Sequence, residues 1–283
     1  MASILPVASR LLISLLFIAY SAFCVLIIFV LAENIDQPPR ELSFDNSTIF
    51  DNTELDAPDF SSFDIVEEKK TQFFNFLTPL INELNVDIRN SRSRLLDINN
   101  KLNNGVKLSR RERFFVIRLA DRYSVSDSEA SLKDKVQRLL RRVDELPPSM
   151  VLAQAATESA WGTSRFAVRG NNYFGEWCFK SGCGFVPKLR EEDSYHEVAK
   201  FDDVRSSLHS YFFNINTHRA YRELRSIRAS LREEDKLLDG RVLVEGLTRY
   251  SERREDYIVE LKQIIAINEL HLLDQEQSQN SSM

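Results

Sequence analysis

The stretch "TESAWG", residues 157–162, places a carboxylate at the end of an apolar helical pattern. Glu158 follows the run "MVLAQAA" and borders the face on which that run's apolar residues recur at helical spacing. A glutamate in such a place is seldom without a partner or a function. Burial against this face and Trp161 would raise its pKa, and so would the negative end of a helix that stops near Gly162.

A carboxyl that stays protonated near neutral pH is a proton donor, which acid-catalysed glycoside cleavage requires. The alternatives for Glu158 are an exposed surface glutamate or one half of an ion pair.

Cysteines and histidines are the other residues that could do chemistry. Cys178 and Cys183 flank "FKSG", and in an exported protein we expect them to form a disulfide that closes a small loop. Zinc needs more ligands than these two cysteines supply. The histidines show no ligand spacing: His196, His209, His218 and His271. We therefore expect no metal and no cofactor.

The elements that must position these residues are mostly helical. Apolar residues recur at helical spacing from Phe73 until Asn104-Gly105 breaks the pattern. Ser109 is an N-cap candidate with Glu112 three residues later, and a further helix is expected to begin at Ser128.

The second half of the chain continues in helices around one short extended region. Pro147-Pro148 suits the first turn of the helix that carries Glu158, and a short helix is expected to end at Gly170. Residues 184–201, "GFVPKLREEDSYHEVAKF", offer two short extended runs around an acidic turn, which predicts a β-hairpin. A last long helix is expected to begin at Ser251 and to pack through Tyr257, among others.

The N-terminus predicts export. Residues 11–32 are uncharged and almost wholly apolar, long enough for a helix that crosses a bilayer, and Arg10 before them favours a cytoplasmic N-terminus. Cleavage near Ala32, as in a signal peptide, is the alternative. Residues 33–64 are rich in Asp, Asn, Pro and Ser and predict a disordered linker. A formal net charge of −5 does not suggest a nucleic-acid partner.

Three segments together resemble the bacterial glucosaminidase family, glycoside hydrolase family 73, whose members are similar to mannosyl-glycoprotein endo-beta-N-acetylglucosaminidase. They are "AQAATESAWGTSRFAVRGNNYFGEW", "AKFDDVRSSLHSYFFNINTHRAYRELR" and "LTRYSERREDYIVELKQII". The resemblance spans roughly residues 147–270 and extends back to about Phe73. The combination of "AQAA-ES-WG" with "NNYFG" is its specific part.

The resemblance implies a mainly α fold: a lysozyme-like helical domain with a small β-hairpin lobe and a cleft for peptidoglycan glycan strands. Together with the N-terminal pattern, it predicts the following segments: 1–10 cytoplasmic tip, 11–32 membrane anchor, 33–64 linker, 65–146 helical lead-in, 147–272 glucosaminidase domain and 273–283 disordered tail. The catalytic domain would then lie in the periplasm, tethered to the inner membrane through residues 11–32.

The family's catalytic and cleft positions carry over to particular residues. Glu158 matches the general acid, and Tyr250 matches a tyrosine of the site. The resemblance also implies a second acid on the β-lobe, for which Glu191 and Glu192 are the candidates. The implied substrate-binding residues are Trp161, Asn172, Tyr173, Phe174 and Tyr257.

The implied reaction is hydrolysis of the β-1,4 bond after N-acetylglucosamine. Besides the acid Glu158, it needs a β-lobe carboxylate that activates water, or attack by the substrate's own acetamido group with Tyr250 positioning it. A lytic transglycosylase on the same scaffold is one competing function. A peptidoglycan-binding protein without catalysis is another, because a fold alone does not fix an activity.

Overall fold

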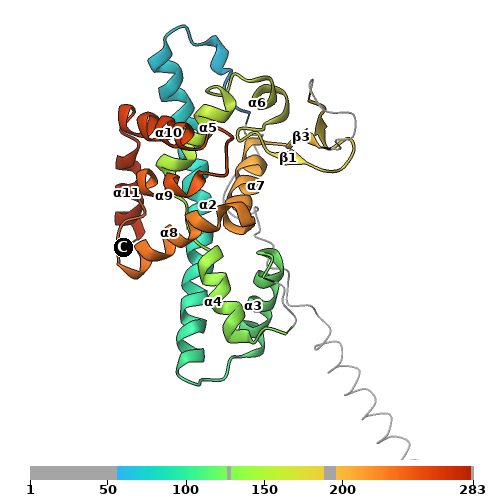
Figure 1. Cartoon of the computed structure of the whole chain (residues 1–283), viewed down its shortest axis with the longest axis vertical. Coiled ribbons are helices and arrows are strands. Elements are labelled where there is room, and N and C mark those ends of the chain that lie inside the picture. Colours follow the sequence, from blue (N-terminus) through green and yellow to red (C-terminus); the bar gives the residue numbers. More distant parts are fainter. Residues whose placement is uncertain (1–55, 126–128, 188–195, 282–283) are drawn as a thin grey trace, which may run out of the picture. The chain divides into compact units, whose positions relative to one another are not determined.

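A computed structural model describes residues 56–125, 129–187 and 196–281 of the 283-residue chain (Figure 1). Residues from Leu55 onward form one compact unit. The predicted anchor, residues 11–32, lies outside the described residues, as does most of the predicted linker. Within the described ranges, no helix combines the length and the apolar character that crossing a membrane requires.

Helices make up most of the described residues. In chain order the elements are η1 (Phe60–Ser62), α2 (Val66–Asn103), α3 (Arg110–Arg122), α4 (Leu132–Arg142), α5 (Pro148–Ser159), α6 (Arg165–Gly170), β1 (Trp177–Cys178), β2 (Gly184–Phe185), β3 (Glu197–Ala199), α7 (Val204–Thr217), η2 (Arg219–Tyr221), α8 (Arg222–Glu233), α9 (Gly240–Leu243), η3 (Val244–Leu247), α10 (Glu255–Ile267) and α11 (His271–Ser281). The prediction of a mainly helical fold with a small β region is confirmed; the lysozyme-like arrangement stays a prediction.

The predicted helix boundaries are confirmed where a capping or breaking residue marks them. Asn104 caps the end of α2, and Ser109 and Glu112 form a capping box at the start of α3. Two predicted starts are wrong. The N-cap of α4 is Ser131, whose hydroxyl accepts from the Asp134 amide, and α10 begins at Glu255 instead of Ser251.

Helix α5 lies at the centre of the unit and contacts α2, α9, α10 and α11 (Figure 1). The sequence predicts one apolar face for this helix. In the structure it is buried on every side from Pro148 to Ala156, because its neighbours surround it. Its C-terminal end, where Glu158 lies, reaches a pocket.

A buried ion-pair network ties α2, α4 and α8 to the start of α5. Asp144 lies 2.8 Å from Arg232 and 3.4 Å from Arg92, and the guanidinium of Arg228 also faces it. Burial alone would raise the pKa of Asp144, but the three arginines hold it below its ordinary value. The predicted lead-in, residues 65–146, is therefore an integral part of the same folded unit.

The small sheet has the strand order β1-β3-β2, with both pairs antiparallel. Val198 in β3 lies opposite Trp177 on one side and Phe185 on the other. Strands β2 and β3 are the two arms of the predicted hairpin, and β1 is an addition that the sequence did not reveal. The ring of Phe185 packs on Phe166, which holds the sheet against α6.

Parts of two segments that were predicted to be disordered are ordered in the structure: residues 56–64 of the linker and residues 273–281 of the tail. Phe60, inside the predicted linker, is 1% exposed and packs so closely on Gly162 that a side chain there would lie 2.3 Å from its ring. Residues 273–281 of the predicted tail form most of α11. Its Asp274 is buried and accepts hydrogen bonds from the Ser149 amide, the Ser149 hydroxyl and the Gly240 amide.

Candidate active site

A pocket of about 810 Å³ lies between the C-terminal end of α5, the β1 region, α7 and the turn that precedes α10. Both Glu158 and Tyr250, which the sequence predicts as catalytic residues, line it. They are 92 residues apart in the chain, and the fold brings them to one cavity. The fold thus brings two predicted site residues to one pocket, and their catalytic roles stay predictions.

Glu158 is held by a chain of buried hydrogen bonds. Tyr211 donates to the side-chain oxygen of Gln154, the Gln154 amide donates to the hydroxyl of Tyr257 at 3.1 Å, and Tyr257 donates to Glu158 Oε1 at 2.8 Å. Gln154 lies one helical turn before Glu158 on α5. The sequence offered this glutamine only as part of "AQAA", so its contribution to the site was missed.

The direction of these bonds locates the proton of Glu158. Because Tyr257 accepts from Gln154 and donates onward, Glu158 Oε1 is an acceptor. A proton on the carboxyl must then reside on Oε2. This oxygen lies on the side of Gly175, where a Cβ, if the residue had one, would be 3.6 Å from it. Gly175 also lines the pocket, so the acidic proton lies next to the cavity.

Burial raises the pKa of Glu158 above its ordinary value of 4.5, as the sequence predicts. The hydrogen bond from Tyr257 acts in the opposite direction, because it stabilises the carboxylate. Glu260 raises the pKa further and Arg253 lowers it. Burial is the largest of these effects, so the carboxyl is biased toward the protonated form.

The segment "NNYFG" passes close to Glu158, and hydrogen bonds of Asn172 fix its conformation. Asn172 is 1% exposed; its amide donates to the carbonyls of Glu176 and Ala199, and its oxygen accepts from the amides of Phe174 and Glu176. Gly175 has φ +64°, a conformation that favours glycine. Asn172 is thus a support for the loop, and its contact with substrate stays a prediction.

The aromatic residues that were predicted to line the cleft differ in whether they reach the pocket. Phe174 lines the pocket and stacks on Tyr211 at 4.0 Å, and Tyr250 donates to the Phe174 carbonyl at 2.9 Å. Tyr173 is 1% exposed and packs against Phe73 in the core, and its contact with substrate stays a prediction.

Tyr257 and Trp161 do not line the pocket. Tyr257 is 2% exposed, stacks on Tyr250 at 5.6 Å and reaches the site through its bond to Glu158. Trp161 packs edge-on against Phe73 and Phe74 of α2. The predicted second acids, Glu191 and Glu192, lie outside the described residues.

Glu176 is a second carboxyl in the pocket wall, and the sequence analysis missed it. Its Oε1 accepts from Asn214, while its Oε2 is buried without a hydrogen-bond partner among the described residues. Burial raises its pKa to about 7, against an ordinary value of 4.5, although hydrogen bonds from Ser210 and Asn214 favour the charged form. Its position directly after "NNYFG" was the only feature of the sequence that could have indicated a place in the site.

Two exposed aromatic rings stand at the β-lobe side of the pocket. Trp177 is 55% exposed and Phe179 is 78% exposed, and both line the cavity. The ring of Trp177 stacks on His196 at 3.9 Å, which fixes its orientation. Exposed aromatic faces beside a cavity are surfaces on which a ligand with an apolar face can stack.

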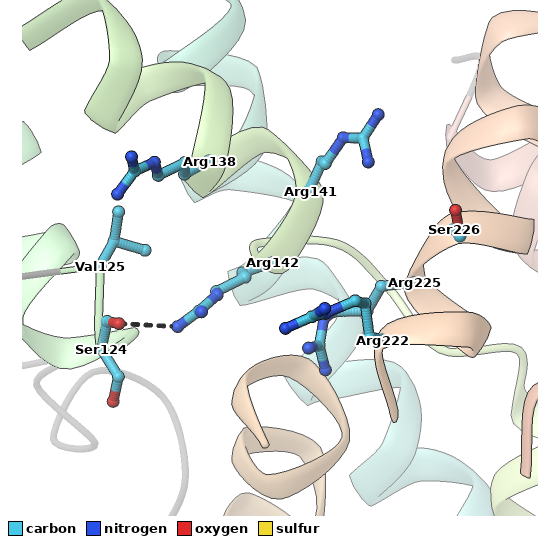
Figure 2. A pocket seen from close by; sticks show the side chains of 8 residues that line it. All are labelled: Ser124, Val125, Arg138, Arg141, Arg142, Arg222, Arg225 and Ser226. Atoms are coloured by element: carbon cyan, nitrogen blue, oxygen red, sulfur yellow. Dashed lines mark hydrogen bonds between the residues drawn. The ribbon is translucent and has the colours of Figure 1, made fainter. Parts of the chain in front are cut away.

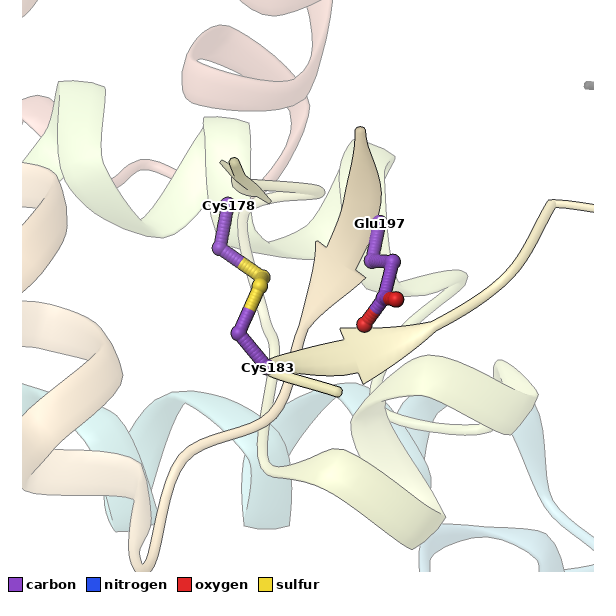
Figure 3. A group of neighbouring side chains, drawn as sticks. All are labelled: Cys178, Cys183 and Glu197. Atoms are coloured by element: carbon purple, nitrogen blue, oxygen red, sulfur yellow. A yellow bond between two sulfur atoms is a disulfide. The ribbon is translucent and has the colours of Figure 1, made fainter. Parts of the chain in front are cut away.

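The predicted disulfide is present between Cys178 and Cys183 and closes the loop between β1 and β2 (Figure 3). Glu197 lies beside it and accepts from the amides of Gly182 and Gly184. These three residues have the types that bind metals, but the two sulfurs are bonded to each other and the carboxylate holds the loop. The arrangement therefore stabilises the β-lobe.

Comparison with known proteins gives two matches. The family model for mannosyl-glycoprotein endo-beta-N-acetylglucosaminidase matches residues 133–270, from α4 to the residue before α11. Protein bax of Escherichia coli (strain K12) is 34% identical over 200 residues, which cover 71% of this chain and 70% of that protein. No solved structure matches the chain significantly.

Proposed function

The chain belongs to the glucosaminidase family, and on that basis we propose that it hydrolyses the glycan strands of peptidoglycan at the β-1,4 bond after N-acetylglucosamine. The observation that carries the proposal is the placement of Glu158. Its carboxyl lies in the wall of the pocket, its pKa is raised, and one of its oxygens is held by Tyr257.

Glu158 is the general acid of the proposed reaction. Its Oε2 proton passes to the glycosidic oxygen as the bond to the anomeric carbon breaks, and positive charge develops on the sugar ring. The carboxylate that remains keeps its hydrogen bond from Tyr257, which stabilises the charged product form. The same bond fixes the orientation of the carboxyl before the transfer.

The sugar whose anomeric carbon loses the glycosidic oxygen needs a nucleophile on the face opposite that oxygen. A β-lobe carboxylate, Glu191 or Glu192, that activates water gives inversion at the anomeric carbon. Attack by the substrate's acetamido group, positioned by Tyr250, gives retention. The configuration of the freshly formed reducing end separates these two routes.

The pocket's other residues support a glycan as the ligand. Trp177 and Phe179 offer exposed aromatic faces on which the apolar faces of sugar rings stack. Asn214, His218 and Arg219 add polar groups to the opposite wall. A mixture of aromatic faces and hydrogen-bonding groups suits a polar ligand with flat apolar faces.

The proposal includes a location. The apolar residues 11–32 after Arg10 support a single membrane anchor with the catalytic domain in the periplasm. The Cys178–Cys183 disulfide supports an oxidising compartment. Protease protection of the domain in intact cells, lost when the outer membrane is opened, is the expected result.

Product analysis tests the proposed bond specificity. We expect the purified chain to release fragments from cell-wall peptidoglycan that end in a reducing N-acetylglucosamine, identified by borohydride reduction and mass spectrometry. Fragments that end in an anhydro ring on N-acetylmuramic acid would instead identify a lytic transglycosylase. Binding of the strands without any release would identify a binding protein.

A further inference from the structure

A second pocket, of about 280 Å³, lies between α4, the first turns of α8 and the segment at Ser124 (Figure 2). Most of the residues that line it are arginines: Arg138, Arg141, Arg142, Arg222 and Arg225. In Figure 2, Arg222 and Arg225 extend from α8 in the direction of Arg142 on α4. Nothing in the proposed hydrolysis uses this arginine pocket.

Backbone carbonyl groups hold two guanidinium groups of the arginine pocket in place. Arg142 donates to the backbone carbonyls of Tyr123 and Ser124, and Arg225 donates to those of Ile215 and His218. Carbonyl groups orient a guanidinium but carry no net charge. No Asp or Glu is among the described residues that line the pocket.

The guanidinium groups of the arginine pocket repel one another. Burial lowers the pKa of Arg225 to about 10, and Arg142, Arg228 and Arg222 act in the same direction. Burial also lowers the pKa of Arg142, together with the charges of Arg138 and Arg222. A bound anion would relieve this repulsion, and each guanidinium can hold a carboxylate with two parallel hydrogen bonds.

The arginine pocket adjoins the cleft that contains Glu158. Ser124 lines both cavities. His218 lines the cleft, and its backbone carbonyl accepts the hydrogen bond from Arg225. An anionic group on the Ser124 side of a ligand in the cleft would therefore lie next to the arginine pocket. This adjacency favours an anion that is part of the substrate over a separate molecule.

We propose that the arginine pocket binds carboxylates of the peptide stem attached to the glycan strand in the cleft, and so selects peptide-bearing strands over stripped ones. The proposal rests on the proposed function, because it needs a glycan in the cleft. Peptide stems of peptidoglycan end in carboxylates at a distance from the sugar rings. A strand stripped by an amidase keeps only the lactyl carboxylates, which are attached directly to the sugar rings.

Arg222→Gln tests the proposal. Arg222 is exposed on the first turn of α8, so the substitution should leave folding intact. The matched control is Arg111→Gln on the exposed side of α3. Each full-length variant is assayed on peptide-bearing strands and on the same strands stripped of peptide by an amidase. We expect Arg222→Gln to raise KM for peptide-bearing strands about fivefold and to leave KM for stripped strands unchanged.

A binding measurement separates failure of the site from failure of the proposed function. Full-length protein carrying Glu158→Gln, with and without Arg222→Gln, is titrated with both kinds of strand. Peptide-dependent binding that Arg222→Gln weakens about fivefold supports the arginine pocket even if no strand is cleaved. Three results would overturn the proposal. They are equal affinity for both kinds of strand, an equal loss of affinity for both kinds in Arg222→Gln, and competition by inorganic phosphate as strong as competition by the free peptide.

Discussion

At the scale of single residues, two opposing effects determine whether Glu158 is protonated. Burial beneath the β-lobe side of the cleft raises its pKa, while the hydroxyl of Tyr257 stabilises the carboxylate. The sequence predicted Glu158 as an acid from its place beside an apolar face. It could not predict Tyr257 as the donor, because 99 residues separate the two and only the packing of α10 on α5 joins them.

Tyr257→Phe tests this balance. Removing the hydroxyl raises the pKa of Glu158 further, and a general acid is active only while it is protonated. Activity falls as pH rises through the pKa of the acid, so the alkaline limb of the kcat/KM profile should move to higher pH. Tyr123→Phe, at the end of α3, is the control and should leave the limb in place. An unmoved limb in Tyr257→Phe would show that the bond does not affect the catalytic proton.

Glu176 makes a prediction about stability. Its pKa is raised to about 7 in the folded protein, against 4.5 ordinarily. The folded state therefore binds this proton more tightly than the unfolded state does. The bound proton's contribution to the free energy of unfolding is complete below pH 4.5 and is lost as pH rises through about 7.

Substitution by glutamine removes that pH dependence. The free energy of unfolding of the wild type should fall by about 3 kcal/mol more than that of Glu176→Gln between about pH 4.5 and about pH 8, measured by urea denaturation. Glu223→Gln, on the exposed side of α8, serves as the control. Parallel curves for the wild type and Glu176→Gln would contradict the buried, protonated state.

At the scale of elements, the turn that carries Tyr250 is positioned by close packing of η3 on α8. A side chain at Gly246 would lie 2.3 Å from the Cα of Leu224, so only glycine allows this approach. The sequence predicted helix ends with recognisable caps, such as Ser109, but not η3. A contact between two backbones leaves no periodic apolar pattern, and a lone glycine does not identify its partner.

Gly246→Ala should therefore destabilise the protein by about 2 kcal/mol or more, because the backbone of α8 must shift to admit the methyl group. Gly105→Asn is the matched control. Gly105 has a positive φ, but a Cβ at this position would meet no atom within 4 Å, and asparagine tolerates the conformation. Equal melting temperatures for the two variants would rule out the close approach as the cause.

At the scale of the whole molecule, segments on both sides of the matched family region complete the core. Phe60 precedes it and packs on Gly162, and Asp274 follows it and binds the first turns of α5 and α9. The tail, residues 273–283, was predicted to be disordered. Its anchoring residue is a buried aspartate that accepts from backbone amides, a role that hydrophobic periodicity does not reveal.

Removal of residues 271–283 tests the role of α11. The deletion leaves the Ser149 and Gly240 amides buried without their acceptor, and it should lower the free energy of unfolding by about 3 kcal/mol or more. A shorter deletion, residues 279–283, keeps Asp274 and should leave the denaturation midpoint almost unchanged. If the two deletions had equal midpoints, α11 would not stabilise the unit.

The central claim is that Glu158 donates the proton that breaks the glycan strand. The most direct measurement is the rate at which purified peptidoglycan yields new reducing ends with the wild type and with Glu158→Gln, whose amide can still accept from Tyr257. The account predicts that Glu158→Gln binds strands as the wild type does but releases ends at least about a hundredfold more slowly. Release by Glu158→Gln at the wild-type rate would contradict it.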